Sequence, residues 1–115
     1  LAASQGSLTL ISSTNGLNGG SALSGPAYAV AKAGLVNLVR YLAKEWAPEG
    51  LRVNTLAPGI IRTPLIDDPD ALAPIHPLGR VGEVEDTSDA ILFLARAGFV
   101  TGLTLDVDGG YSHAR

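Results

Sequence analysis

The feature that most constrains the fold is a long helical repeat followed closely by a strand-forming run. Between residues 28 and 46 apolar side chains recur every three or four positions, and Pro48 and Gly50 end the pattern. These positions are Leu35, Leu38, Val39, Leu42, Ala43 and Trp46. Residues 7–12 before this helix and residues 52–57 after it favour β-strands. A strand, a helix and a strand in this order predict a crossover unit in a parallel sheet.

The rest of the chain adds a loop, a second helix and a third strand. Prolines and glycines interrupt residues 60–82, so we expect a loop with one short helical turn at residues 69–73. Residues 83–97 have a helical pattern with acidic residues in the first turn and Gly98 after the end. Residues 103–107 favour a third strand. The order predicts an α/β fold with three parallel strands and crossover helices.

The composition excludes several classes of function. Eight Lys and Arg against eleven Asp and Glu give a net charge of −3, so we expect no nucleic-acid partner. Without cysteine, the chain has no disulfide, thiolate metal site or cysteine nucleophile. No apolar run is long enough to span a bilayer and no signal peptide is evident, so we expect a cytoplasmic protein without a membrane partner. Because the chain contains no methionine and begins at Leu1, we expect a piece of a longer protein.

The histidines do not indicate a metal centre. His76 and His113 are far apart and lack a ligand spacing, so we expect solvated side chains and no metal. A hydrolase built from Ser13, Asp106 and His113 is a further arrangement to consider. No nucleophile-elbow sequence surrounds Ser13, which argues against it.

Tyr28 and Lys32 are the strongest candidates for chemistry. Their spacing of four at the start of the helix places the phenol and the ammonium on one face, one turn apart. A free tyrosine, with a pKa of about 10, exchanges protons poorly near neutrality, and a neighbouring cation favours the phenolate. The pair therefore suits acid–base catalysis, although the spacing alone is also typical of an ordinary helix surface.

Several segments, taken together and in order, resemble the C-terminal half of a short-chain dehydrogenase/reductase. The segments are Ile11-Ser12-Ser13, Tyr28-Ala29-Val30-Ala31-Lys32-Ala33-Gly34, Arg52-Val53-Asn54-Thr55-Leu56-Ala57-Pro58-Gly59 with Thr63, Pro77-Leu78-Gly79-Arg80, Val100-Thr101-Gly102 and Val107-Asp108-Gly109-Gly110. The resemblance implies half of a Rossmann-type doubly wound parallel sheet, with the three strands as neighbours. It also implies NAD(P)-dependent hydride transfer between an alcohol and a carbonyl.

The resemblance implies a role for each catalytic candidate. Tyr28 would exchange a proton with the substrate oxygen, Ser13 would hydrogen-bond that oxygen, and Lys32 would bind the nicotinamide ribose and keep Tyr28 acidic. Ser13 lies fifteen residues before Tyr28, a spacing slightly longer than is usual in the family. Ser12 is therefore a second candidate, and either hydroxyl can instead bond its own backbone at the strand end.

The cofactor, NAD or NADP, would bind at the carboxyl ends of the strands. Tyr28 and Lys32 would contact it, and the segment that begins at Pro58 and Gly59 would form part of its site. By resemblance, the backbone at Ile61 and the hydroxyl of Thr63 would hold the nicotinamide carboxamide. Residues 64–77 would cover the substrate.

The chain lacks the glycine-rich phosphate loop of a dinucleotide-binding fold, since the cluster Gly16, Gly19 and Gly20 precedes the helix by too many residues. We therefore expect residues 1–115 to be the C-terminal part of one NAD(P)-binding domain whose glycine-rich half is absent. Alone it would be inactive, and the inner edge of its first strand would lack a partner. The alternative is a structural or dimerisation module, and the family resemblance implies a homodimer or homotetramer.

Overall fold

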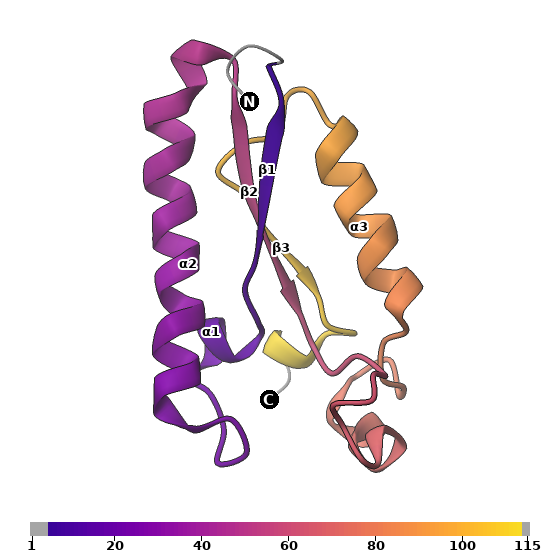
Figure 1. Cartoon of the computed structure of the whole chain (residues 1–115). Coiled ribbons are helices and arrows are strands. Elements are labelled where there is room, and N and C mark those ends of the chain that lie inside the picture. The colour runs from indigo at the N-terminus through magenta and orange to yellow at the C-terminus, as the bar shows by residue number, and fades with distance from the viewer. Residues whose placement is uncertain (1–4, 114–115) are drawn as a thin grey trace.

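A three-stranded sheet between two long helices forms the framework of the molecule (Figure 1). The computed structural model describes residues 5–113. Its elements are β1 (Ser7–Ile11), α1 (Asn15–Asn18), α2 (Gly25–Trp46), η2 (Ala47–Glu49), β2 (Arg52–Pro58), η3 (Pro69–Ile75), α3 (Val84–Arg96), β3 (Thr104–Val107) and η4 (Tyr111–His113). Both predicted long helices and all three predicted strands are present.

The three strands are parallel and lie in the order β1-β2-β3. Leu8 of β1 pairs with Val53, and Leu56 of β2 pairs with Leu105. The prediction of three neighbouring parallel strands is confirmed. Their carboxyl ends meet at the lower rim in Figure 1, where α1, η3 and η4 also lie. Within residues 5–113, β1 pairs only with β2, so its other edge is unpaired.

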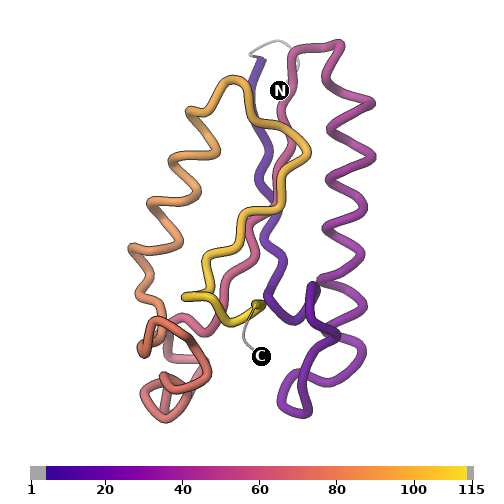
Figure 2. Tube along the Cα trace, turned by 180° about the vertical axis from the view of Figure 1, so that it is seen from behind, coloured from indigo at the N-terminus to yellow at the C-terminus, as the bar shows by residue number. Residues whose placement is uncertain are grey.

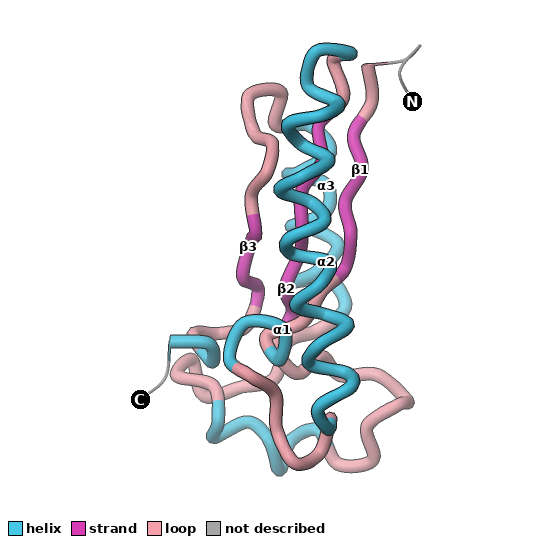
Figure 3. The backbone as a smooth tube through the Cα atoms, turned by 90° about the vertical axis from the view of Figure 1, so that its left-hand side faces the viewer, coloured by secondary structure: helices cyan, strands magenta, loops and turns pink. Residues whose placement is uncertain are grey.

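The two long helices cover opposite faces of the sheet (Figures 2 and 3). α2 packs on β2 and β1, and α3 packs against all three strands from the other side. Val39 and Ala43 of α2 and Val53 of β2 form the buried centre of the α2 side. Residues packed around this centre are Leu8, Leu10, Leu42 and Trp46. The helical repeat therefore faces the core as predicted, except that Leu38 is 44% exposed.

The helix boundaries follow from local chemistry. α2 begins at Gly25, earlier than the sequence pattern indicates, because Pro26 fits the first turn, where a helix needs no amide donor. At the start of α3, Glu83 and Asp86 form a capping box in which each side chain accepts a backbone N–H. The predicted turn in the proline-rich loop is present and is longer than expected, as η3. None of the helices within residues 5–113 has the length and apolar character needed to cross a bilayer.

Arg52 joins the start of β2 to the end of α3. Its guanidinium donates to the carbonyl oxygens of Leu94, Ala95 and Ala97 at 2.7, 2.7 and 2.8 Å. These are the carbonyls that a helix C-terminus leaves without intrahelical donors, and a cation there also complements the helix dipole. The contact fixes the C-terminal end of α3 against the amino end of the sheet.

Candidate active site

Three segments with predicted functional residues meet at the carboxyl rim of the sheet. The chain leaves β1 at Ile11 and continues through Ser12 and Ser13. The first turns of α2 carry Tyr28 and Lys32, and β2 ends at Pro58. This is the edge at which open α/β sheets bind their ligands.

Tyr28 and Lys32 lie together, as their spacing predicts. The Lys32 Nζ is 5.6 Å from the centroid of the Tyr28 ring. The same nitrogen donates to the carbonyl oxygen of Ile11 at 3.1 Å. Lys32 therefore bridges from the phenol on α2 to the end of β1. An ammonium has three donors and the described residues accept from one of them, so two remain for other acceptors.

Ser12 and Ser13 are both buried but make different contacts. The Ser12 hydroxyl donates to the carbonyl oxygen of Lys32 at 2.7 Å, which ties the end of β1 to α2. The Ser13 oxygen accepts the backbone N–H of Asn15 at 3.2 Å. Within the described residues Ser13 uses its hydroxyl only as an acceptor, so its hydrogen remains for a ligand. Ser12, in contrast, uses its hydrogen inside the fold.

Thr14 and Gly16 complete this corner, and no sequence pattern assigns either of them such a role. Thr14 donates to the Pro58 carbonyl oxygen through its backbone N–H at 3.0 Å and its hydroxyl at 2.8 Å. A Cβ on Gly16 would lie 2.7 Å from the carbonyl carbon of Lys32 and 2.9 Å from the Ser12 hydroxyl oxygen. Position 16 therefore requires glycine, because any side chain would prevent the close approach of α1 to α2.

The segment after β2 is held so that the N–H and C=O of Ile61 have no hydrogen-bond partner within residues 5–113. Gly82 N–H donates to the Ile60 carbonyl, and Arg62 N–H donates to the Gly82 carbonyl, both at 2.8 Å. In this parallel bridge the N–H and C=O of Ile61 project to the opposite side. Gly59 is required by close packing, because a Cβ there would lie 2.9 Å from the Asp108 Cα. Thr63 follows in the same loop and is half-buried.

His76 departs from the sequence expectation. The sequence predicts a solvated side chain, but His76 is only 3% exposed. The reason is hydrogen bonding that replaces water: Ile60 N–H donates to its Nε2, and its Nδ1 lies 3.2 Å from the Leu72 carbonyl oxygen. His113 is exposed as expected. Among the described residues no group of three metal-ligating side chains forms.

Ion pairs surround the loops of the rim. Arg62 pairs with Asp70 of η3 and with Glu83, and hydrogen bonding to these carboxylates raises the pKa of the guanidinium. Arg80 pairs with Asp86, and this bond together with the Glu83 N–H lowers the pKa of the Asp86 carboxyl to about 2. Desolvation raises the pKa of Asp108, but hydrogen bonds from Ser112 and Gly110 outweigh it and the net shift is downward.

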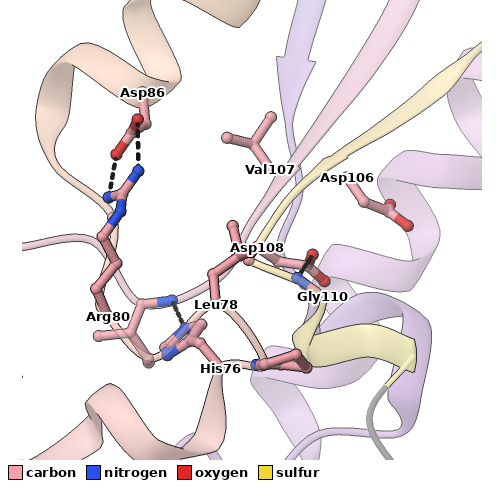
Figure 4. A pocket seen from close by; sticks show the side chains of 12 residues that line it. His76, Leu78, Arg80, Asp86, Asp106, Val107, Asp108 and Gly110 are labelled. Carbon is pink, nitrogen blue, oxygen red and sulfur yellow. Dashed lines mark hydrogen bonds and ion pairs between the residues drawn. The ribbon is translucent and has the colours of Figure 1, made fainter.

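A cavity of about 470 Å³ lies between the start of α3 and the end of β3 (Figure 4). Arg80 and Asp86 form one side, and Val107 and Asp108 form another. None of the predicted site residues lines it, although Gly59 and Ile61 lie next to lining residues. Nearby, His113 Nε2 is 3.3 Å from an Asp106 oxygen. No hydrogen bond among the described residues joins Ser13 to this pair, so the geometry does not assemble a hydrolase triad.

Comparison with known proteins agrees with the sequence resemblance. A family model described as enoyl-(acyl carrier protein) reductase matches residues 1–112. Cis-4-hydroxycyclohexanecarboxylate dehydrogenase of Sinomonas cyclohexanicum is 42% identical over 118 residues, which cover 96% of this chain and 47% of that protein. A short-chain type dehydrogenase/reductase of Mycobacterium ulcerans has a TM-score of 0.89 and 35% identity, with coverage of 99% of this chain and 44% of that chain.

The NADP-bound structure of ElxO has a TM-score of 0.87 and 31% identity, and the match covers 98% of this chain and 49% of that chain. The chain spans about half the length of the curated relatives it matches. The family model and the identities extend across nearly all of residues 1–115. The chain belongs to the short-chain dehydrogenase/reductase family.

Proposed function

We propose that the protein is an NAD(P)-dependent oxidoreductase that interconverts an alcohol and a carbonyl group. The observation that carries this proposal is the Lys32 ammonium, which lies 5.6 Å from the Tyr28 ring and is held by the Ile11 carbonyl at the end of β1. The pair places a cation beside a phenol at the carboxyl rim, where open α/β sheets bind their ligands, and tyrosine is one of the side chains that serve in acid–base catalysis. Support also comes from the relatives, one named as a dehydrogenase of a hydroxylated acid and one solved with NADP.

The donor set at the rim fits the nicotinamide end of such a cofactor. The open peptide groups of Ile61 offer one donor and one acceptor, which a carboxamide requires. We assign the carboxamide contacts to Ile61 and Thr63, and the ribose contacts to Tyr28 and Lys32. Pro58 and Gly59 set the path of this segment at the end of β2. When bound, the cofactor supplies or accepts the hydride.

The chain's own side chains handle the proton and orient the substrate. Tyr28 gives its phenolic proton to the substrate oxygen during reduction and takes it back during oxidation. Ser13 donates its free hydroxyl hydrogen to the same oxygen and fixes its direction. The Ile11 carbonyl holds the Lys32 ammonium in place beside the phenol. Residues 64–77, with η3, would cover the substrate.

A further proposal concerns assembly. We infer that residues 1–115 form the C-terminal part of one nucleotide-binding domain and that the protein is a homodimer or homotetramer. Val30, Leu38 and Tyr41 of α2 are 72%, 44% and 61% exposed. At about 100° per residue they share one face of the helix, and burying such a face in a partner is favourable. The second candidate function, a structural module without catalysis, rests on this same face. Cytoplasmic location stays a prediction.

Substitution of Tyr28 separates the two functions. In the full-length gene product, Tyr28→Phe removes only the phenolic oxygen, and we expect kcat to fall by about 10²- to 10⁴-fold while NAD(P)H still binds. Tyr41→Phe, an exposed tyrosine on the same helix, is the matched control and keeps the wild-type rate. A Tyr28→Phe enzyme with most of its activity would refute the proposed chemistry. Absence of saturable NADH or NADPH binding by the wild type would favour the structural module.

A further inference from the structure

His76 is a buried side chain that the proposed chemistry does not use. It follows η3 and precedes Pro77, and its ring contacts segments that are far apart in the sequence. A Cβ on Gly59 would lie 3.0 Å from the Nε2 of His76, and a Cβ on Gly109 would lie 3.4 Å from the Cβ of His76. The Tyr111 ring of η4 packs on it at 5.7 Å between centroids. His76 therefore lies where η3, η4 and the loop after β2 meet.

The hydrogen bonds of His76 require one protonation state. Ile60 N–H donates to Nε2 at 3.2 Å, so Nε2 carries no hydrogen (Figure 4). Nδ1 lies 3.2 Å from the Leu72 carbonyl oxygen, which accepts a hydrogen from it. A neutral imidazole offers one acceptor and one donor, and both are used. The ring is thus a rigid connector between Ile60 and η3.

Ile60 is held on both sides of its backbone. Its N–H donates to His76, and its carbonyl accepts the Gly82 N–H at 2.8 Å. The next residue is Ile61, whose open peptide groups face the proposed nicotinamide carboxamide. A change at His76 would leave the Gly82 bridge in place but release the N–H side of Ile60. The position of the Ile61 peptide groups therefore depends on the His76 ring.

We propose that His76 is a positioning residue that fixes the loop of residues 58–63 for the nicotinamide, through its Nε2 and the Ile60 N–H. This inference rests on the proposed function, because it takes the loop to be the carboxamide site. His76 also attaches the loop to η3, so the cofactor side and the substrate-covering segment keep one relative position. Within the described residues His76 has no contact with the Tyr28 phenol, and the proposed proton exchange at Tyr28 does not pass through it.

The test compares two substitutions in the full-length gene product. His76→Phe keeps a ring but has no acceptor, whereas His76→Gln supplies an amide oxygen for Ile60 N–H. A buried donor left without its acceptor costs enough free energy to weaken cofactor binding by about tenfold. We expect His76→Phe to raise the dissociation constant and KM for NAD(P)H by about this factor, with a smaller change in kcat at saturation. His76→Gln should recover most of the affinity, and His113→Phe, at an exposed histidine, should change neither.

Two measurements on the wild type do not depend on activity or on the folding of a variant. The ring ¹⁵N shifts of His76 should report the neutral form with hydrogen on Nδ1, and the Ile60 amide should exchange slowly. Hydrogen on Nε2, or a fast-exchanging Ile60 amide, would overturn the inference. So would a folded His76→Phe protein with wild-type cofactor affinity. If the wild type binds no NAD(P)H at all, the proposed function fails, while the ring shifts and the Ile60 amide still decide whether His76 holds the loop.

Discussion

The ammonium of Lys32 lies 5.6 Å from the centroid of the Tyr28 ring and at the same time donates to the Ile11 carbonyl oxygen at 3.1 Å. Lys32 thus contacts a helix residue four positions earlier and a strand residue 21 positions earlier. The first contact follows from helix geometry, but the second requires the tertiary fold. This double contact fixes the charge relative to both the phenol and the strand end that carries the serines.

We expect the activity of Lys32 variants to depend on the shape of the new side chain as well as on its charge. Lys32→Met keeps the aliphatic stem and removes the ammonium, so we expect kcat to fall by about 10²-fold or more and the KM for the cofactor to rise. Lys32→Arg keeps the charge in a planar guanidinium that does not reproduce a point charge, so we expect partial activity. Steady-state kinetics on the full-length gene product measure both. Lys44→Met, in the last turn of the same helix, is the control, and equal loss there would contradict a specific role for Lys32.

We expect substitution to show that Ser12 has a structural role and Ser13 a catalytic role. Ser13→Ala removes the hydrogen proposed to reach the substrate oxygen, so we expect a fall in kcat of about 10²-fold with a small change in melting temperature. Ser12→Ala removes the bond to the Lys32 carbonyl, so we expect a loss of about 1 kcal/mol of stability and a smaller kinetic effect. Thermal unfolding and kinetics of both variants check this. The reverse pattern would assign the substrate contact to Ser12.

Much of the fold could be predicted because its signals are local. The repeat that ends at Trp46, the stop at Gly50 and the β-prone run from Arg52 onward each depend on neighbouring residues, and together they require a parallel crossover. The start of α2 at Gly25 was missed because small and polar residues carry no apolar periodicity. The exposure of Leu38 was missed because the period identifies an apolar stripe without saying which partner covers each position.

The candidate site was predictable only where helix spacing or family resemblance identified it. Tyr28 and Lys32 satisfy a helix rule, so their proximity follows from the sequence. The contacts of Gly16 with Lys32 and of His76 with Ile60 join residues that are 16 positions apart. No local pattern distinguishes these two residues from a loop glycine and a surface histidine. A histidine placed directly before a proline in a loop gives no signal of burial.

Acid should destabilise the protein through Asp86. The hydrogen bond from Arg80 and then the Glu83 N–H lower the pKa of Asp86 to about 2, from 3.8 for a free side chain. A carboxyl with a lower pKa in the folded state stabilises the fold above the unfolded value and loses that contribution as the pH falls through the folded value. We therefore expect the free energy of unfolding to decrease between pH 4 and pH 2, and Asp86→Asn to reduce this dependence.

Denaturant unfolding of the full-length gene product at several pH values measures the effect of Asp86. Asp70 and Asp108 also have lowered pKa values, so a residual dependence should remain in the Asp86→Asn variant. Asp89→Asn, at an exposed position on the same helix, is the control and should keep the wild-type profile. An unchanged acid dependence in Asp86→Asn would show that the Arg80 pair does not contribute to it.

Thr55 carries a buried hydroxyl whose removal should stabilise the protein, in contrast to Asp86, whose interactions contribute stability. It is fully buried in β2, and its hydroxyl oxygen has no hydrogen-bond partner within the described residues. Strand alternation places it on the same face as Val53, which packs against α2. An unsatisfied buried hydroxyl costs about 1–3 kcal/mol, so replacing it with the methyl group of Thr55→Val should raise the free energy of unfolding by about 1 kcal/mol.

Thr101 provides the control for Thr55, because its hydroxyl oxygen accepts the Val53 N–H at 3.0 Å. Thr101→Val leaves the Val53 N–H of β2 without its acceptor, so it should lower the free energy of unfolding. Thr55→Val, in the same strand as Val53, should raise it. Denaturant titration of the full-length gene product gives both values. The two substitutions exchange the same atoms, so a difference in sign isolates the hydrogen bond from the change in volume. If Thr55→Val proves destabilising as well, the Thr55 hydroxyl has a partner in solution, and a bound water between β2 and α2 is the group that would satisfy it.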